Sequence, residues 1–404
     1  MAERPIAFVV VRYGEEVVGG AESFVRSLAE ELHGRGWPVE VLTTCALNSF
    51  SWENHYPAGE ELVGGVRVRR FPTSRQALRP QRFRRLASAI EEGRRLSRRN
   101  ELRWLKAVVY SEEMCEYISR NAERYRAFLF IPYLFGTTYL GWERVRDRAL
   151  LIPCLHDEPF ARLGIFRRMV CEAKGVLYNT PQERELAKRL YGEKADGHVV
   201  GLGLDDYVAD EARFRRRFGL QGDFVLYAGR RESGKNTPLL IRYFCNYLVH
   251  TGRDLRLVLV GSGPVEVPRG FEGKVVDLAF LKEEDKRDAY AAAAVLCQPS
   301  LNESFSIVQL EAWLAGTPTL VHGDCPVTRS HVENSQGGLW FRDYHQFHAA
   351  LDLLLDSPGL RAKMGELGRA YVLRNYSWDR IVRRFGEALR GSGFPCPEAG
   401  DGGG

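Results

Sequence analysis

Two glutamates, Glu303 and Glu311, lie eight positions apart around the expected start of a helix. They belong to segment 299–318, which follows one short apolar run and precedes another. The apolar spacing predicts a helix that begins near Ser306. In a helix each Cα–Cβ bond leans toward the N-terminus, so the carboxylate of Glu311 leans back toward Glu303. Both carboxylates are therefore expected to meet at the helix start.

The helix start would also present the free backbone N–H groups of Ser306, Ile307 and Val308. Such an end attracts anions through its unpaired N–H groups and the helix dipole. Phosphate at the N–H groups and hydroxyls at the carboxylates describe a sugar nucleotide. The alternative is that Glu303 only complements the dipole and Glu311 is solvated. We favour the ligand, because Glu311 interrupts an apolar stretch in which an unpartnered charge is costly to bury.

Two loops upstream could supply positive charge and close backbone approach. Gly229-Arg230-Arg231-Glu232-Ser233-Gly234-Lys235-Asn236 follows the predicted strand 224–228, and Gly261-Ser262-Gly263-Pro264 follows strand 255–260. Ligands of open α/β sheets bind beyond the carboxyl ends of the strands. Arg230 and Lys235 could neutralise a diphosphate there. The alternative is a solvated loop.

Two features of the first half lie at similar positions. Gly19 and Gly20 stand between the predicted strand 6–11 and the predicted helix 23–33, either as a turn or as a site of close ligand approach. They do not form the Gly-x-Gly-x-x-Gly fingerprint. His156 follows strand 149–153. A lone histidine is more often structural, but its place at a strand end beside two acids makes it a candidate.

The predicted elements form two α/β series separated by a linker at 202–210. Strands are expected at 6–11, 39–43, 66–71, 127–131, 149–153 and 175–179, and then at 224–228, 255–260, 275–277, 295–298 and 319–321. Helices are expected at 182–190, within 343–367 and at 380–389. Alternating strands and helices of this kind predict parallel sheets.

One stretch of the first series is rich in arginine. It contains Arg79, Arg82, Arg84, Arg85, Arg94, Arg95, Arg98, Arg99 and Arg103. Leucines and an isoleucine at helical spacing indicate helices. The stretch is either a solvated helical face or a contact for an anionic membrane leaflet, lipid pyrophosphate or polymer.

Composition excludes several classes. The net charge of +5 is too small to indicate nucleic acid by itself, and the arginines lack interleaved aromatics that would stack on bases. We therefore expect no nucleic-acid partner. No apolar run reaches the roughly 18–20 residues of a membrane span, and no signal-peptide pattern opens the chain. The eight cysteines are scattered without a Cys-x-x-Cys pair. A reducing cytoplasm is expected.

With these motifs in order, the chain resembles the retaining, nucleotide-sugar-dependent glycosyltransferases of the GT-B fold, family 4. The resemblance covers roughly residues 6–389. It is carried by Gly19-Gly20-Ala21-Glu22, Gly229-Arg230 with Lys235-Asn236, Gly261-Ser262-Gly263-Pro264, and the Glu-x7-Glu spacing of Glu303 and Glu311.

The resemblance implies an α/β fold of two facing Rossmann-like domains with the donor in a cleft between them. We expect an acceptor-side domain at 1–203 and a donor-binding domain at 204–376. A helix at 377–390 is expected to pack back on the first domain, and a flexible tail is expected at 391–404.

The resemblance also implies roles for single residues. Arg230 and Lys235 would bind the diphosphate, Glu311 the ribose hydroxyls and Glu303 the sugar hydroxyls. His156 would lie near the reacting carbon. Catalytic residues would thus be His156, Glu303, Arg230 and Lys235. Donor-binding residues would be Gly19, Gly20, Arg230, Lys235, Gly261, Ser304, Phe305, Ser306, Ile307, Val308 and Glu311.

The chain departs from the family pattern at two places. The usual Glu-Gly-Phe-Gly is Glu303-Ser304-Phe305-Ser306 here, which adds hydroxyls beside the sugar. A glutamate usually present after Pro318 is missing, and we assign segment 328–332 no role. The first departure bears on the identity of the sugar.

The expected reaction moves a sugar from a UDP- or GDP-linked donor to an acceptor hydroxyl with retention, without metal or other cofactor. No Asp-x-Asp is present, and cations would replace the metal. A saccharide or lipid-linked acceptor fits bacterial polysaccharide, glycolipid or glycoconjugate synthesis, in the cytoplasm or at the inner face of the membrane. Alternatives are epimerisation or hydrolysis on the same fold, or a non-catalytic sugar-nucleotide-binding protein.

Overall fold

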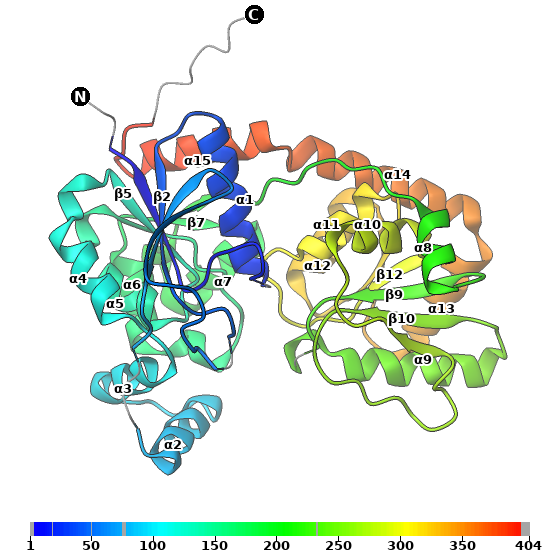
Figure 1. Ribbon diagram of the computed structural model, residues 1–404. Helices are drawn as coiled ribbons and strands as arrows, with labels where there is room; N and C mark the ends of the chain where they lie inside the picture. The colour runs from blue at the N-terminus through cyan, green and yellow to red at the C-terminus, as the bar shows by residue number, and fades with distance from the viewer. Residues whose placement is uncertain (1–3, 18, 50, 75–77, 232, 397–404) are drawn as a thin grey trace, which may run out of the picture. The chain divides into compact units, whose positions relative to one another are not determined.

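The structure is a computed structural model, and it describes residues 4–17, 19–49, 51–74, 78–231 and 233–396. The chain forms two compact α/β units (Figure 1). Unit 1 comprises Met1–Gly203 and Trp378–Gly404, and unit 2 comprises Leu204–Ser377. The second unit is therefore continuous in sequence, whereas the first consists of two separate segments.

Unit 1 is built on an eight-stranded sheet of order β3-β4-β2-β1-β5-β6-β7-β8. The strands are β1 Ile6–Val10, β2 Val39–Thr44, β3 Gly59–Val63, β4 Val66–Phe71, β5 Ala127–Ile131, β6 Ala149–Leu151, β7 Gly175–Tyr178 and β8 His198–Val199. All pairings are parallel except that of β3 with β4. Strands β1, β2, β5 and β6 are buried along their whole length. Burial on both faces explains their unbroken apolar runs.

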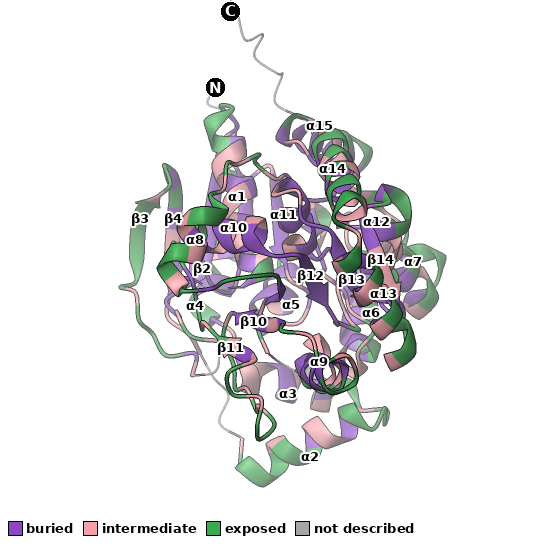
Figure 2. Ribbon diagram, turned by 90° about the vertical axis from the view of Figure 1, so that its right-hand side faces the viewer, coloured by how far each residue is buried: buried purple, intermediate pink, exposed green. Residues whose placement is uncertain are grey.

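The helices of unit 1 pack against this sheet, and Figure 2 shows its edge strand β3 exposed. They are α1 Gly20–Gly34, α2 Pro80–Glu91, α3 Arg98–Val108, α4 Glu112–Arg120, α5 Gly136–Trp142, α6 Gly164–Glu172, α7 Pro181–Tyr191 and α15 Trp378–Gly391. Short 3-10 turns lie at η1 Ala122–Arg124, η2 Arg146–Arg148, η3 Pro159–Arg162 and η4 Glu193–Ala195.

Unit 2 is built on a parallel six-stranded sheet of order β11-β10-β9-β12-β13-β14. The strands are β9 Phe224–Ala228, β10 Arg256–Val260, β11 Val275–Asp277, β12 Val295–Gln298, β13 Thr319–His322 and β14 Gly338–Phe341. The helices are α8 Glu211–Phe218, α9 Thr237–Thr251, α10 Glu283–Ala292, α11 Ile307–Leu314, α12 Pro326–Ser335, α13 Tyr344–Asp356 and α14 Pro358–Asn375. The turn η5 Ser233–Lys235 precedes α9. The predicted α/β class with two parallel-sheet units is confirmed.

The predicted strands are present within two residues of their expected ends, but β3, β8 and β14 were missed. Strand β3 is mostly exposed, since it pairs only with β4 at the edge of the sheet, and its polar sequence carries no apolar pattern. Strand β8 has only two residues. Helix α1 starts at Gly20 rather than Ser23, so Gly19 is its N-cap and Gly20 its first residue.

Helix α15 packs on unit 1 through an apolar face. The Phe385 ring stacks on Phe8 at 6.4 Å between centroids and contacts Trp37 at 5.9 Å. The expectation of a flexible tail from residue 391 is wrong for its described part. Phe394 is buried and Pro395 accepts a hydrogen bond from Arg126, because an aromatic side chain gains from leaving water. Residues 397–404 lie outside the described residues.

Helices α2 and α3 lie at one end of unit 1 (Figure 1), where α3 contacts α5 and α6 and α2 contacts η3. The two helices also contact each other, and their buried Leu86, Ile90 and Leu105 belong to the hydrophobic core of unit 1. The arginines of α2 point outward, and among the helices of the described residues none is long and apolar enough to cross a bilayer.

Candidate functional site

The sequence motif around Glu303 forms the loop between β12 and α11. Ser306 is the N-cap of α11 and lies in the left-handed region, at φ 66° and ψ 62°. The helix is anchored by the buried Leu310 and Trp313, and the Trp313 indole donates to the Gly337 carbonyl at 2.7 Å. The helix thus starts one residue after the predicted position, with its first N–H groups at the loop.

Glu303 is held beside the upstream cation. Lys235 Nζ lies 2.7 Å from Glu303 Oε1, and Gln298 Nε2 donates to the same oxygen at 3.0 Å. Only 8 % of the Glu303 side chain and 19 % of the Lys235 side chain are exposed. Fold topology therefore joins two predicted residues that are 68 positions apart. The loop that carries Lys235 ends at Asn236, whose φ of 56° turns the chain into α9.

Glu311 is partnered by helix α10 rather than solvated. Lys286 Nζ lies 3.1 Å from its Oε1, and the Tyr290 hydroxyl donates to its Oε2 at 2.8 Å. Burial alone would lower the pKa of Lys286, but the charges of Glu311 and Glu283 outweigh it and raise that pKa. Sequence reasoning missed Lys286 and Tyr290. Their spacing of four on one helix was the available signal.

The glycines of the two upstream loops permit a close backbone crossing. Gly229 has φ 144° and Gly261 has φ 130°, and a Cβ on Gly261 would overlap the Gly229 carbonyl. Arg230 is exposed just after β9, and its carbonyl accepts from the Tyr227 hydroxyl at 2.7 Å. The next residue, Arg231, instead pairs with Asp277. Arg230 therefore remains the predicted phosphate ligand at this strand end.

His331 supports the motif from behind, although its segment was given no role. Its Nε2 lies 3.1 Å from the Phe305 carbonyl oxygen, and its Nδ1 lies 3.2 Å from the Tyr371 hydroxyl. The Phe305 ring packs edge-on against His331 and Tyr376. Burial lowers the pKa of His331 to about 4, so the ring is neutral near pH 7. No local sequence pattern announces such a contact.

Three polar atoms of the same segment are buried without a hydrogen-bond partner in the described part of the chain. They are Gln298 Oε1, Ser300 Oγ and Ser306 Oγ. Buried polar groups normally have partners, and exceptions require an explanation. Ser306 combines this cost with a left-handed backbone, which glycine would adopt freely. Local rules broken together in one loop are typical of functional sites.

In unit 1, Gly19 and Gly20 precede and begin α1. A Cβ on Gly19 would overlap the carboxylate of Glu22, which forms a buried ion pair with Arg12 at 2.5 Å. Gly20 has open space around it. The lack of a side chain at Gly19 is therefore required by the ion pair, whereas Gly20 leaves its surroundings accessible.

His156 is partly exposed after β6, in the loop that leads to η3. The two acids beside it have partners of their own. Asp157 pairs with Arg162 at 2.6 Å and with Arg189 at 2.8 Å, and Glu158 accepts from the Tyr133 hydroxyl at 2.6 Å. These acids therefore fix the loop, which limits the positions that the imidazole can reach.

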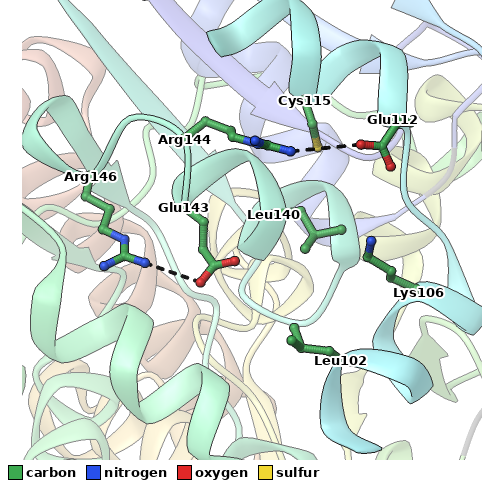
Figure 3. Close-up of a pocket in the computed structure, with 8 residues that line it drawn as sticks. All are labelled: Leu102, Lys106, Glu112, Cys115, Leu140, Glu143, Arg144 and Arg146. Atoms are coloured by element: carbon green, nitrogen blue, oxygen red, sulfur yellow. Dashed lines mark hydrogen bonds and ion pairs between the residues drawn. The ribbon is translucent and has the colours of Figure 1, made fainter. Parts of the chain in front are cut away.

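A separate cavity of about 370 Å³ opens between α3, α4 and α5 (Figure 3). Its charged lining residues form ion pairs, Arg146 with Glu143 at 3.3 Å on the same segment and Arg144 with Glu112 at 3.9 Å. Burial raises the pKa of Cys115 in its wall to about 12, so the thiol stays protonated. None of the predicted site residues line this cavity.

Comparison with known families matches both units. Residues 208–371 match the family described as "Glycosyl transferases group 1", and residues 19–203 match a "Glycosyl transferase 4-like domain". The D-inositol 3-phosphate glycosyltransferase of Kribbella flavida is 31% identical over 406 residues, which cover 89% of this chain and 88% of that protein.

Solved structures share the fold. Sucrose-phosphate synthase from Thermosynechococcus elongatus has a TM-score of 0.72 at 21% identity, covering 96% of this chain and 99% of that chain. Anabaena Alr3699/HepE in complex with UDP-glucose has a TM-score of 0.70 at 16% identity, covering 96% and 100%.

Proposed function

Because the chain belongs to the GT-B glycosyltransferases of family 4, we propose that it moves a sugar from a nucleoside diphosphate sugar to an acceptor hydroxyl, with retention of anomeric configuration. The observation that carries the proposal is the Lys235–Glu303 pair at the N-terminus of α11, with Glu311 further along the same helix. In this proposal Lys235 binds a phosphate group, and the neighbouring Glu303 accepts hydrogen bonds from sugar hydroxyls.

The leaving diphosphate gains negative charge in the transition state. Arg230, Lys235 and the first N–H groups of α11 stabilise that charge electrostatically. These cations take the place of a metal ion, so we expect turnover in the presence of EDTA. The leaving phosphate accepts the proton of the acceptor hydroxyl on the same face of the sugar. His156 orients or polarises groups at the reacting carbon.

Glu311 binds the ribose hydroxyls in this proposal. Each carboxylate oxygen has more than one acceptor position, so bonds from Lys286 and Tyr290 leave capacity for a ligand. The two donors also keep the carboxylate in one orientation. A preoriented acceptor loses less conformational entropy when the donor binds.

The sugar contacts Glu303 and the hydroxyls of Ser304 and Ser306. A uridine-linked donor is the first to test, because UDP-glucose is present in the complex of the similar Anabaena protein. GDP-linked sugars are the second class. Gly19, Gly20, Gly261 and Phe305 complete the proposed donor-binding set, through close backbone approach and loop packing.

A screen of UDP- and GDP-linked sugars by thermal shift, followed by product analysis with saccharide and lipid-linked acceptors, tests the proposal. A stabilising donor that yields an α-linked product from an α-linked donor supports it. Release of free sugar or an epimer without transfer would instead indicate hydrolysis or epimerisation. Donor binding without turnover would indicate a non-catalytic protein.

The acceptor is proposed to be anionic or lipid-linked, presented at a negatively charged membrane surface to helices α2 and α3. Desolvation and the charges of Arg99 and Arg82 lower the pKa of Arg103, which means that guanidinium groups of the two helices crowd together. Arg82, Arg99 and Arg103 form no ion pair within the described residues. Crowded, unpaired cations favour a polyanionic partner.

A further inference from the structure

The loop after β6 has an unusual backbone start. Cys154 lies at φ 52°, in the left-handed region that a residue with a side chain rarely adopts. The Asn179 side-chain amide donates to its sulfur at 3.6 Å. A strained residue persists only when surrounding contacts over-determine it. The contacts that do so here converge on one buried carboxylate.

That carboxylate belongs to Glu183, in the first turn of α7. Its Oε1 accepts from the Leu155 backbone N–H at 2.6 Å, and its Oε2 accepts from the Asn179 backbone N–H at 2.6 Å. Glu183 is 1 % exposed. Its own N–H donates to Thr180, the N-cap of the helix, at 3.1 Å. The side chain thus joins the start of α7 to the residue that precedes His156.

Burial raises the pKa of Glu183 to about 8, and the backbone N–H groups of Leu155 and Asn179 oppose that shift. The Glu183 carboxyl group is costly to bury, but it bonds to two loops, which an apolar side chain at this position could not do. An ordinary capping box would need only local bonds of its own helix. The bond to Leu155, 28 positions away, has no capping purpose.

We propose that Glu183 is a positioning residue that fixes the loop of His156 and thereby the location of the imidazole. The inference rests on the proposed function for the role of His156 in turnover. The placement of the ring by Glu183 does not depend on it. Because the loop is tied at Leu155, Asp157 and Glu158, loss of the Leu155 bond frees the residue directly before His156.

Glu101 provides a matched control in the same unit. It is 5 % exposed, and its two carboxylate oxygens accept from the Gly164 and Ile165 backbone N–H groups at 3.0 Å each. These groups open α6, which follows the His156 loop after the turn η3. Glu101→Gln therefore loses a carboxylate-to-backbone contact of the same kind without touching the proposed site.

The test compares full-length Glu183→Gln and Glu101→Gln with the wild type. Glutamine retains one acceptor oxygen but turns an NH2 group toward the second N–H, so each variant loses a bond. One readout is the NMR spectrum of the His156 ring, assigned by comparison with His156→Gln. The other is UDP release from UDP-glucose without acceptor, as kcat and KM.

We expect Glu183→Gln to shift the His156 ring signals and to lower kcat roughly 10- to 100-fold with little change in KM, as a displaced catalytic group does. Glu101→Gln should lower the melting temperature by about as much as Glu183→Gln does. It should leave the His156 ring signals and kcat unchanged. Unchanged ring signals in folded Glu183→Gln, or an equal kcat loss in Glu101→Gln, would overturn the inference.

Two further outcomes have assigned meanings. If Glu183→Gln does not fold, Glu183→Asp, which reaches only one of the two N–H groups, takes its place under the same criteria. If His156→Ala keeps full turnover while Glu183→Gln still shifts the ring signals, the role of His156 in the proposed function fails and the positioning by Glu183 stands.

Discussion

At the scale of single residues, the Lys235–Glu303 pair joins the two groups that the proposed sugar nucleotide needs. These are a cation for its phosphates and a carboxylate for its sugar hydroxyls. The Glu303 carboxylate is poorly exposed, and its Oε1 is bonded to Lys235 and Gln298. Removal of one partner of a poorly exposed ion pair leaves a charge without compensation, which costs more than the pair contributes when intact. Lys235 is therefore expected to affect both stability and turnover.

Replacement of Lys235 by alanine should lower kcat about 100- to 1000-fold, the range for a lost transition-state donor. It should also destabilise the chain by about 1–3 kcal/mol, discounted for partial exposure. Turnover of the identified donor and urea denaturation measure the two effects. Lys274→Ala is the control, since Lys274 pairs with Asp254 at 2.6 Å on the exposed surface of the same unit. Full activity in Lys235→Ala would contradict the assigned role.

His331 makes stability depend on pH. Its folded pKa of about 4 lies below the ordinary value of 6.5, so between these values the unfolded chain binds a proton that the folded chain does not. The contribution of His331 to stability is therefore complete above pH 6.5 and is lost as the pH decreases toward 4. The loss from this residue should be on the order of 3–4 kcal/mol at most, at about 1.4 kcal/mol per pKa unit.

His331→Gln should flatten the dependence, because glutamine can still donate to the Phe305 carbonyl but does not titrate. Urea denaturation at pH 4.5 and pH 7 measures the difference. His345→Gln, at an exposed position of α13, is the control and should retain the wild-type slope. Parallel curves for wild type and His331→Gln would show that the pH dependence arises elsewhere.

At the scale of elements, the start of α11 carries the hydroxyl of Ser306 at a position where glycine would make the chain more stable. Ser306 has φ 66° and a buried Oγ without a partner in the described chain. Ser306→Gly should raise stability by about 1 kcal/mol, since glycine adopts this backbone without strain. It should also raise KM for the cognate sugar. Melting temperature and donor kinetics test both. A stabilised variant with unchanged kinetics toward every donor would remove Ser306 from sugar recognition.

The exposed arginines of helices α2 and α3 have a second testable role, which is the proposed binding to an anionic membrane surface. The triple change Arg82→Gln, Arg99→Gln and Arg103→Gln should abolish flotation with vesicles that contain anionic lipid at low salt. Each basic residue near such a surface contributes about 1 kcal/mol. Donor hydrolysis without acceptor should be unchanged. Arg253→Gln, which breaks an ion pair with Asp356 in unit 2, is the control. No flotation of the wild type at low salt would contradict the membrane proposal.

At the scale of the whole molecule, each unit presents its candidate residues at the carboxyl ends of parallel strands. In unit 1 the loops after β1 and β6 carry Gly19 and His156, and in unit 2 the loops after β9, β10 and β12 carry the remaining groups. Helix α15 returns the end of the chain to unit 1, where Phe385 packs on Phe8. Within each sheet these loops lie at the same edge, because all parallel strands of one sheet end on the same side.

The sequence by itself determined the strands, the loops that follow them and the family. Unbroken apolar runs such as 6–10 and 224–228 are enough for buried parallel strands, and the Glu303 and Glu311 spacing is local to one loop and the helix that follows it. These features depend on the few residues around them. The same reasoning missed β3, whose polar sequence pairs only at an edge.

Only the tertiary structure decided the partners. Lys286 on Glu311, His331 on Phe305 and Glu183 on Leu155 each join elements separated by 25 to 28 positions. Periodicity tells which face of a helix is buried, but it does not tell which polar group of another element lies opposite. Which group lies opposite depends on strand order and helix packing. The fold likewise decides that the backbone at Ser306 is left-handed, at a position where the family pattern has glycine.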